Sequence, residues 1–420
     1  MSAMSRDWDR RSVLRAAAGM AALGGLAACG SNNGRSDGGS GGGKAISQWY
    51  HQYGEKGTQQ AALKFAKAYD KANVKVQWIA GDYDAKLTSG LLSSSGPDVF
   101  EYHPNLQMVQ SKQIVPLDDI LADVKSDFNP KDIASHTVDG KVYGVRMIDD
   151  PQFLWYRKSL FAAAGVQVPT TLDELVEAAA KLTKGKMKGL YLGNAVTNAA
   201  KPLVWATGGD LLDANNKPTY HTDEVVAGLK TLRKLYTSGH LLLGAPTEAW
   251  DPSSLINELC AMQWCGMWAM PQILAAFPGD IGIFPFPTAS ANGKPAVYNG
   301  GWSTFVSAKA KDVDAAKAFV KWLWIDQKKY QEEWSTAYGF HIPPRISLAA
   351  GATKLKTGLP AEGVKLFNDY GHFDNPVWTT TMNTAFEDVF ADSVRGSKDP
   401  EASLDKCDTK VDRELKQLFG

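Results

Sequence analysis

From residue 45 onward, short apolar runs alternate with segments whose apolar residues recur at helical spacing. The runs Ala45–Tyr50, Lys75–Ile79 and Pro97–Phe100 predict three strands, and the segments Thr58–Lys71 and Tyr83–Leu92 predict the two helices between them. Alternation of strands and helices is typical of a sheet covered by helices. The pattern therefore predicts that the chain begins its folded part with an α/β domain.

The same test predicts further elements along the chain. Lys141–Arg146 and Phe153–Tyr156 are strand-like, and Cys260–Cys265 reads as a buried strand. Thr171–Leu182 is expected to be a helix that Thr171 caps, because Glu174 follows three residues later. Four more segments have helical spacing: Val225–Tyr236, Asp314–Trp324, Met382–Ser393 and Pro400–Leu418.

Composition narrows the class of protein. The chain has 420 residues, of which 44% are hydrophobic and 21% charged, which is enough for two domains and excludes a disordered tail protein. Lysine plus arginine and aspartate plus glutamate each number 45, so there is no basic excess of the kind that nucleic-acid binding requires. The 13 tryptophans are more than a core of this size needs, and some of them are expected to face a ligand.

The N-terminus reads as an export signal. Arg10–Arg15 precedes an apolar run of about 13 residues that ends in Leu26-Ala27-Ala28-Cys29, too short for the roughly 20 residues of a membrane span. The last four residues resemble the bacterial lipobox, and the paired arginines resemble a twin-arginine signal, with a Sec signal as the alternative. We therefore expect residues 1–28 to be a signal peptide, Cys29 to be lipidated, and residues 29–44 to form a flexible tether on the outer face of the cytoplasmic membrane.

The cysteines and histidines predict neither a metal site nor a cofactor. Cys260 and Cys265 would point to opposite faces of a strand about 16 Å apart, whereas a disulfide needs Cα atoms within about 7 Å. A disulfide from Cys407 to either of them stays open, beside the alternative of three buried thiols. The seven histidines show no metal-ligand spacing.

Four stretches in order resemble the signatures of family 1 extracellular solute-binding proteins of ABC transporters, the maltose-binding-protein-like family. Ser95–Phe100 with Ile114–Asp118 resembles "GPDVF … Leu-Asp", and Leu154–Phe161 with Pro169–Leu175 is similar to "YYNKDLF … PPTTWDEL". Further along, Ala261–Trp268 resembles "AMxxxGxW", and Gly300–Ser307 with Ala315–Phe319 matches "GGx … S … AAxxF". Arg157 and Cys265 depart from the family pattern without affecting the expected fold.

The resemblance implies a periplasmic-binding-protein-like α/β fold of two lobes, each a sheet flanked by helices, with the ligand in the cleft between them. We expect residues 45–150 plus 305–338 to form the N-terminal lobe and residues 151–304 plus 339–420 the C-terminal lobe. Hinges are expected near Asp149–Gln152 and Ser303–Phe305. The implied ligand is a carbohydrate, delivered to the permease subunits of an ABC transporter by a monomeric, non-enzymatic binding protein that closes over it.

Candidate ligand-binding residues are aromatic rings for sugar faces and polar groups for sugar hydroxyls. The resemblance points to Trp268 as a ring and to Asp150 as the carboxylate, although its neighbour Asp149 leaves open which of the two faces the cleft. Trp302 is a second candidate ring, because it follows Gly300-Gly301 and precedes a strand that leads into the crossover. Strand ends add further candidates, because ligands of open α/β sheets lie beyond the carboxyl ends of the strands: Trp49, Tyr50, His51, Glu101, Tyr102 and His103. Weaker candidates precede a turn or a helix: Trp205, Trp250, Asp251, Asn299 and Trp378.

Three alternatives stay open from the sequence. A secreted glycoside hydrolase would also use aromatic walls and paired carboxylates, which Asp150, Glu101 and Asp251 could imitate. A surface adhesin would bind no free sugar. A binding protein of the same fold could instead take a non-sugar solute, such as a polyol or a glycerol phosphodiester.

Overall fold

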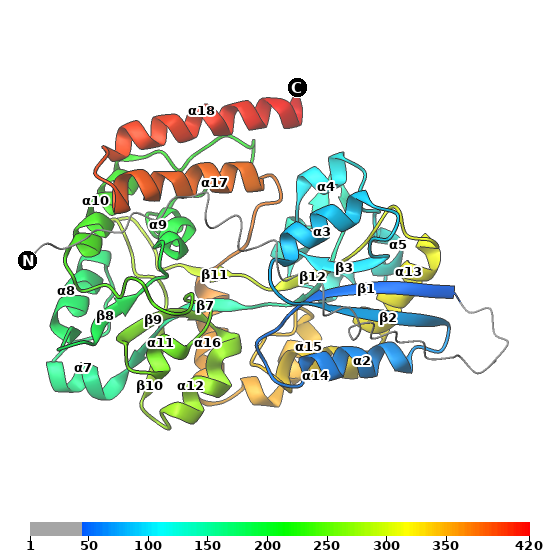
Figure 1. Cartoon of the computed structure of the whole chain (residues 1–420), viewed down its shortest axis with the longest axis horizontal. Coiled ribbons are helices and arrows are strands. Elements are labelled where there is room, and N and C mark those ends of the chain that lie inside the picture. Colours follow the sequence, from blue (N-terminus) through cyan, green and yellow to red (C-terminus); the bar gives the residue numbers. More distant parts are fainter. Residues whose placement is uncertain (1–43) are drawn as a thin grey trace, which may run out of the picture. The chain divides into compact units, whose positions relative to one another are not determined.

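The computed structural model describes residues 44–420, which contain two separate main sheets (Figure 1). The predicted signal peptide, the predicted lipidation site Cys29 and residues 29–43 of the predicted tether lie outside the described residues, and Lys44, the last residue of that predicted tether, is the first residue of strand β1. Each main sheet carries helices on its faces, so the α/β class and the two-lobed architecture expected from the sequence are confirmed.

The first sheet has the strand order β2-β1-β3-β12-β6. Strand β1 pairs in parallel with β2 and β3, whereas β12 runs antiparallel to β3 and β6. The strands are β1 (Lys44–His51), β2 (Ala72–Ile79), β3 (Val99–Tyr102), β6 (Val145–Ile148) and β12 (Trp302–Val306). We call this sheet and its helices the first lobe.

The second sheet has the order β13-β11-β7-β9-β8, with β10 also paired to β7. Its strands are β7 (Pro151–Arg157), β8 (Lys188–Tyr191), β9 (Cys260–Gly266), β10 (Ile281–Phe284), β11 (Val297–Asn299) and β13 (Gly371–His372). We call this sheet and its helices the second lobe. A separate two-stranded sheet joins β4 (Thr137–Val138) to β5 (Lys141–Val142).

The chain passes between the two lobes three times: the segment between α14 and α16 is one passage, and the other two are short connections. Strand β6 of the first sheet ends at Ile148 and β7 of the second begins at Pro151, so the first connection is Asp149–Asp150. Strand β11 ends at Asn299 and β12 begins at Trp302, which places the second connection at Gly300–Gly301. The expected hinge at Ser303–Phe305 instead lies inside β12, where these residues already pair with the first sheet.

Helices cover both sheets, and those of the first lobe surround strands β1–β3 (Figure 1). The helices of the first lobe include α2 (Thr58–Ala68), α3 (Tyr83–Leu92), α4 (Leu106–Gln110), α5 (Asp118–Leu121), α6 (Pro130–Ser135), α13 (Val313–Lys321) and α14 (Lys328–Thr336). Those around the second sheet include α7 (Lys158–Ala164), α8 (Leu172–Leu182), α9 (Ala200–Ala206), α10 (Asp223–Thr237), α11 (Ser253–Ile256), α12 (Met270–Ala276) and α16 (Gly358–Tyr370). Helix α15 (Ile346–Gly351) follows α14 in the chain.

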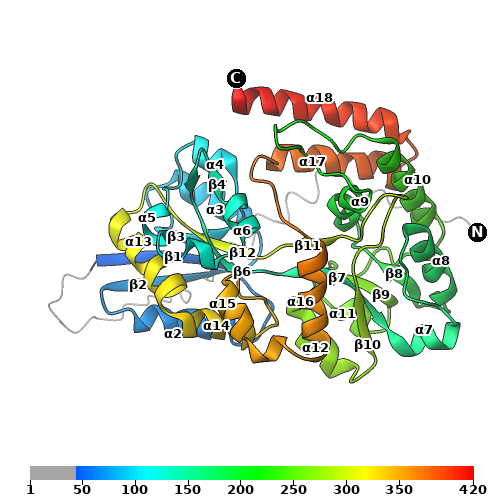
Figure 2. The same ribbon diagram turned by 180° about the vertical axis from the view of Figure 1, so that it is seen from behind.

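The last two long helices, α17 (Thr380–Val389) and α18 (Pro400–Phe419), pack side by side along one edge of the second lobe (Figure 2). Helices α13 and α17 both continue into a π-helical turn, at Trp322–Asp326 and Phe390–Arg395. None of the helices among residues 44–420 has the length and apolar character needed to cross a bilayer.

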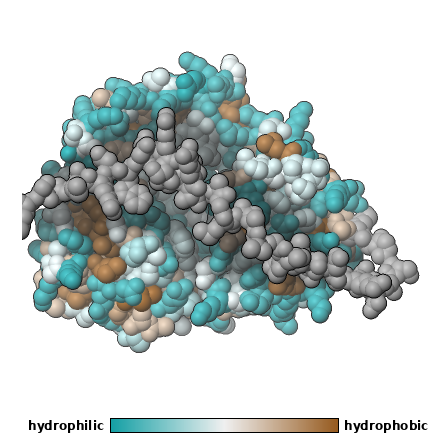
Figure 3. Space-filling model, in the orientation of Figure 1, coloured by the Kyte–Doolittle hydropathy of each residue, from teal (hydrophilic) through white to brown (hydrophobic). Residues whose placement is uncertain are grey.

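Each sheet is buried on both faces, which explains its apolar strands. In the first lobe, Phe65 and Trp334 pack on one face, and Leu87, Phe100 and Phe305 pack on the other. The visible surface is mainly hydrophilic, with scattered hydrophobic patches (Figure 3). The predicted strand Lys141–Arg146 is divided, because β5 ends at Val142 and β6 begins at Val145.

The three cysteines of the described part, Cys260, Cys265 and Cys407, are free and buried. Strand β9 contains both Cys260 and Cys265, as the spacing argument expects. Burial raises the pKa of the Cys260 and Cys265 thiols. Of the two possibilities left open, the structure has buried thiols and not a disulfide.

Candidate ligand-binding site

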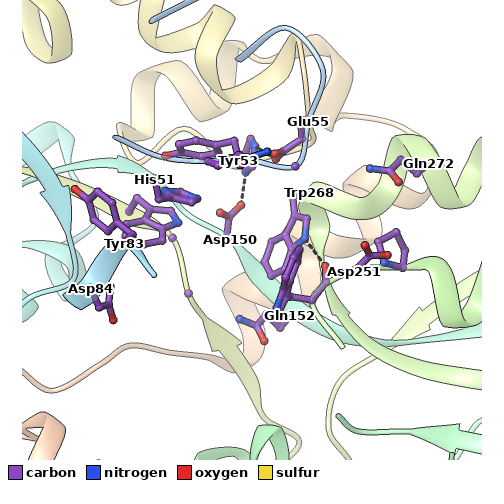
Figure 4. Close-up of a pocket in the computed structure, with 18 of the residues that line it drawn as sticks. His51, Tyr53, Glu55, Tyr83, Asp84, Asp150, Gln152, Asp251, Trp268 and Gln272 are labelled. Atoms are coloured by element: carbon purple, nitrogen blue, oxygen red, sulfur yellow. Dashed lines mark hydrogen bonds and ion pairs between the residues drawn. The ribbon is translucent and has the colours of Figure 1, made fainter. Parts of the chain in front are cut away.

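A cavity of about 820 Å³ lies where the two lobes meet the connections between them (Figure 4). Its size falls in the upper part of the range of about 300–1,000 Å³ that is usual for small-molecule sites. The first lobe contributes the loops after β1 and β2, and the second lobe contributes the segments around Trp250 and Trp268. Asp150, the Gly300–Gly301 connection and His341 lie between these two walls.

Trp268 presents one open ring face to the cavity. A Cβ atom added at Gly266 would lie 1.8 Å from Cζ3 of Trp268, so the indole packs directly on the glycine backbone. Its Nε1 donates a hydrogen bond of 3.0 Å to the carbonyl of Trp250. With one face packed and the ring nitrogen bonded, the other face lines the cavity beside Asp251 and Gln152 (Figure 4).

The Trp250–Asp251 turn is held in place by the side chain of a buried glutamine. Gln263 of β9 donates its amide to the carbonyl of Ala249 at 3.0 Å and to that of Asp251 at 2.7 Å. The Asp251 carboxylate accepts the Ser253 N–H at 2.8 Å, just before α11 begins. Trp250 itself is 63% exposed at the rim of the cavity.

Trp302 also lines the cavity, but two imidazoles lie against its ring. His51 stacks at 4.0 Å between ring centroids, and His103 lies at 4.4 Å. His51 in turn contacts the ring of Tyr53 at 4.0 Å. Trp302 therefore belongs to a cluster of packed rings, in contrast to the open face of Trp268.

Glu101 organises this wall without lining the cavity. It is 1% exposed, and its carboxylate accepts the backbone N–H of His51 at 2.5 Å and the Tyr53 hydroxyl at 2.7 Å. Nδ1 of His51 lies 2.5 Å from the same carboxylate. A catalytic pair of Glu101 with Asp150, considered from the sequence, is therefore not assembled in the cavity.

Asp150 lies at the centre of the site and is bonded to His341. The other nitrogen of His341, Nε2, lies 3.0 Å from the Glu55 carboxylate. Burial alone would lower the pKa of His341, but the Asp150 and Glu55 carboxylates outweigh it and raise that pKa to about 10. His341 is thus a charged link between Glu55, in the loop after β1, and Asp150 in the first connection.

Asp149 and Asp150 have different hydrogen-bond partners, and only Asp150 lines the cavity. Asp149 accepts from Arg146 at 2.9 Å and from the Asn299 amide at 2.7 Å, away from the cavity. The same Asn299 side chain accepts the backbone N–H of Asp150 at 2.9 Å. Of the two neighbours that the sequence could not tell apart, Asp150 lines the cavity and Asp149 belongs to the network behind it.

Six of the predicted residues line the cavity together: Trp268, Trp302, Asp150, His51, Trp250 and Asp251. Three others lie one layer behind them: Glu101, Asn299 and His103. Burial lowers the pKa of His103 to about 4, and its ring supports Trp302.

The remaining predicted residues are placed elsewhere. Trp49 packs in the core with Leu87 and Phe100, and Tyr50 is buried on the opposite face of β1. A central strand with helices on both faces buries successive side chains, so only its last residue, His51, reaches the cavity. Tyr102 is hydrogen-bonded to Asp84 but does not itself line the cavity, Trp205 stacks on His372, and Trp378 packs against Tyr220.

Several lining residues were missed by the sequence analysis. Tyr53 and Glu55 follow β1, and Asp84 follows β2, so the rule about strand ends would have found them if it had been carried further beyond the last strand residue. Gln152 lies two residues after Asp150. Gln272 and His341 are brought in by tertiary structure, and no local signal in the sequence marks them.

One group of possible metal ligands lies outside the cavity. His221, Asp405 and Asp408 bring ligand atoms within 4.8 Å of one another. The His221 ring already pairs with Asp408 at 2.6 Å and with Glu401 at 2.9 Å. We assign no metal to it.

Comparison with known proteins places this geometry in a family. The model of the family described as bacterial extracellular solute-binding protein matches residues 51–324. The diacetylchitobiose binding protein DasA of Streptomyces coelicolor is 27% identical over 364 residues, covering 80% of this chain and 84% of that protein. The arabinooligosaccharide-binding protein of Halalkalibacterium halodurans is 27% identical over 277 residues, covering 62% and 61%.

Solved structures agree in fold. The GacH receptor of Streptomyces glaucescens, solved unliganded and with acarbose, superposes with a TM-score of 0.75 at 26% identity, covering 89% of this chain and 99% of that one. An ABC transporter solute-binding protein from Thermotoga lettingae bound with alpha-D-tagatose has a TM-score of 0.76 at 19% identity over 89% of this chain and all of that one, a likeness of fold alone. Since the family model matches well over half of its length, this chain belongs to the bacterial extracellular solute-binding proteins.

Proposed function

We propose that this protein is the substrate-binding component of an ABC importer, and that it captures an oligosaccharide in the cavity between its lobes. The observation that carries the proposal is the open face of Trp268 opposite a wall of carboxylates and amides. Sugars offer apolar C–H faces to such a ring and hydroxyls to such polar groups. The relatives named for diacetylchitobiose and arabinooligosaccharides point to the same class of ligand.

The proposed cycle is closure of the two lobes over the sugar, followed by delivery to the permease subunits in the membrane. The connections Asp149–Asp150 and Gly300–Gly301 are the proposed hinges, because each joins the two sheets by two residues. The ligand shifts the balance toward the closed form only as far as it binds that form more tightly. Contacts to Trp268 on one lobe and to the loops after β1 and β2 on the other would supply this difference.

The remaining parts of the proposal concern location and assembly. Cleavage before Cys29, its lipidation and the tether would hold a monomeric protein at the outer face of the cytoplasmic membrane. Labelling with a fatty-acid analogue tests this: we expect incorporation into the wild type and loss of it in Cys29→Ala. A wild-type protein that carries no lipid would contradict the anchor and leave the binding function untouched.

The test of function is a thermal-shift screen of the purified protein against mono-, di- and oligosaccharides. A ligand present at about 100 times its Kd stabilises the folded state by about 2.7 kcal/mol, which is readily seen as a higher Tm. We expect one class of oligosaccharide to raise the Tm of the wild type but not that of Trp268→Ala. If no sugar in a broad panel raises the Tm of the wild type, the proposed function is wrong.

A further inference from the structure

The charges that line the cavity are almost all negative. Five carboxylates line it: Glu55, Asp82, Asp84, Asp150 and Asp251. Among the described residues that form the lining there is no lysine and no arginine. The charge that a ligand meets in the cavity depends on how many of these carboxylates are neutralised by other residues of the protein.

His341 neutralises one of the five carboxylates. It lies between Glu55 and Asp150 and is in contact with both, and those two carboxylates raise its pKa far enough to keep the ring charged at neutral pH. Glu55, Asp150 and His341 together therefore carry one net negative charge.

The other three carboxylates form no ion pair with a described residue, although the nearby His51 ring favours the charged form of Asp84. Asp82 accepts the Ala85 N–H at 3.0 Å, and Asp251 accepts the Ser253 N–H at 2.8 Å. Asp84 lies beside the Tyr102 hydroxyl, and its pKa is raised by burial and then by the nearby Asp82. Hydrogen bonds from backbone amides and from a phenol hydroxyl do not neutralise the negative charge of a carboxylate.

These charges lie on both walls. Asp82 and Asp84 follow β2 in the first lobe, whereas Asp251 belongs to the second lobe, and Figure 4 shows Asp84 and Asp251 on opposite sides of Asp150. Closing the lobes over a ligand expels water and strengthens the repulsion between like charges. A neutral sugar leaves that repulsion in place, and a negatively charged one increases it, whereas a positive charge on the ligand offsets it.

We propose that the cavity takes an amine-bearing oligosaccharide, positively charged at neutral pH, in preference to a neutral sugar of the same linkage. The inference rests on the proposed function and narrows its class of ligand. It also disfavours uronic acids, sugar phosphates and the glycerol phosphodiesters left open by the sequence, since the described lining has no lysine or arginine to balance their charge and His341 is already paired with Glu55 and Asp150.

Matched pairs of ligands test the preference by isothermal titration calorimetry at pH 6.5. Chitobiose, the β-1,4-linked disaccharide of glucosamine, is compared with cellobiose and with N,N′-diacetylchitobiose, which share its linkage but lack the charge. In the second set, the β-1,4-linked tetramer of glucosamine is compared with cellotetraose, which has the same linkage and length but no charge. We expect the amine-bearing member of one set to bind at least tenfold more tightly than its neutral partner at low salt, about 1.4 kcal/mol.

Salt and variants identify the source of the preference. At 0.5 M NaCl the ratio of the two affinities should shrink, because salt screens charges at partly exposed sites. Asp84→Asn and Asp251→Asn should each reduce the ratio several-fold. Asp70→Asn, which removes an exposed carboxylate after α2, is the matched control and should leave the ratio unchanged.

The outcomes separate the two proposals. If a neutral sugar binds and its amine-bearing partner binds no more tightly, the preference for charge is wrong and the oligosaccharide-binding function stands. An amine preference that survives both Asp84→Asn and Asp251→Asn would also overturn the assignment to these carboxylates. If no sugar of either set and none of the broad panel binds, both proposals fall.

Discussion

At the scale of single residues, the side chains that line the cavity are held in position by contacts on the side that faces away from it. The Trp268 ring packs against Gly266. The side-chain amide of the buried Gln263 donates hydrogen bonds to the carbonyls of Ala249 and Asp251 and so holds the Trp250–Asp251 turn in place. Pre-positioned groups lose little conformational freedom when a ligand binds, so more of the contact energy appears as affinity.

Gly266→Ala tests the support under Trp268. The added methyl group would lie within about 2 Å of the ring, so the indole must leave its position, and we expect the affinity for the ligand to fall at least tenfold. Calorimetric titration measures the loss. Gly351→Ala, where an added Cβ meets nothing within 4 Å, is the control and should bind as the wild type does.

His341 makes stability depend on pH. Its ordinary pKa is 6.5, and the folded protein raises it to about 10, so the folded state binds this proton more tightly than the unfolded state does. The stabilisation is complete below pH 6.5 and is lost as the pH rises toward 10. Urea unfolding between pH 6.5 and pH 10 should show a decline in the free energy of unfolding that is smaller in His341→Gln.

Removing His341 also leaves Glu55 and Asp150 buried without their cation. At pH 6.5 we expect His341→Gln to lower the free energy of unfolding by about 3–5 kcal/mol. The double variant His341→Gln with Glu55→Gln should recover part of this loss, because it removes one of the two uncompensated charges. No recovery, together with the wild-type pH dependence in His341→Gln, would show that the His341 link does not hold the two carboxylates as described.

At the scale of elements, local sequence rules operate where an element is on the surface of its lobe. Helix α8 has a complete capping box, in which Thr171 accepts the Glu174 N–H and Glu174 accepts the Thr171 N–H. Four residues that the apolar spacing predicts to face the core are buried, namely Leu172, Leu175, Ala179 and Leu182, whereas Val176 of the same predicted face is only partly buried. The cap and the apolar face agree, so the start of this helix is fixed by its own residues.

Thr171→Ala should therefore destabilise the protein by about 1 kcal/mol, the usual cost of losing such a cap. The midpoint of urea unfolding measures it. Thr409→Ala is the same substitution on an exposed position inside α18, where alanine is the better helix former, so it should be neutral or slightly stabilising. Equal effects of the two substitutions would contradict the capping role.

At the scale of the whole molecule, the two connections are joined by a buried network. The Asn299 side chain, at the end of β11, bonds to Asp149 and to the backbone of Asp150, and Arg146 binds Asp149 and the Gly300 carbonyl at 2.6 Å. The backbone of Ile342 pairs with Asp149 as well. Any relative movement of the lobes about these connections must carry this network with it.

Asn299→Ala should weaken that coupling. It leaves the Asp150 N–H and part of the Asp149 carboxylate unpaired, and we expect a loss of about 1–3 kcal/mol in the free energy of unfolding. We also expect a smaller ligand-induced decrease in the radius of gyration, measured by small-angle X-ray scattering. Asn383→Ala, whose side chain bonds to Glu387 within α17, should leave the decrease as in the wild type.

Much of the fold could be predicted from the sequence, because strands and helices with one-dimensional periodicity carry their own signal. Helix α3 begins and ends where the apolar spacing places it, at Tyr83 and Leu92. The sequence predicted one strand over Lys141–Arg146, whereas the structure has two, with Gly144 between them. Gly144 is buried by a tertiary contact: an added Cβ would lie 2.6 Å from the His136 ring and 2.7 Å from that of Phe305. Local spacing cannot register such a contact.

The sequence by itself determined the alternation of strands and helices, through periodicity, and the family with its two lobes, through signature segments that keep their order along the chain. It also named fourteen candidate residues, but only the tertiary structure decided which six of them line the cavity. Only the tertiary structure decided which aromatic rings are packed and which are open. Trp302 and Trp268 look alike in sequence, yet two imidazoles lie against one while the other has a free face. It also brought His341 to Asp150, 191 positions away, because electrostatic partners are selected by distance in space.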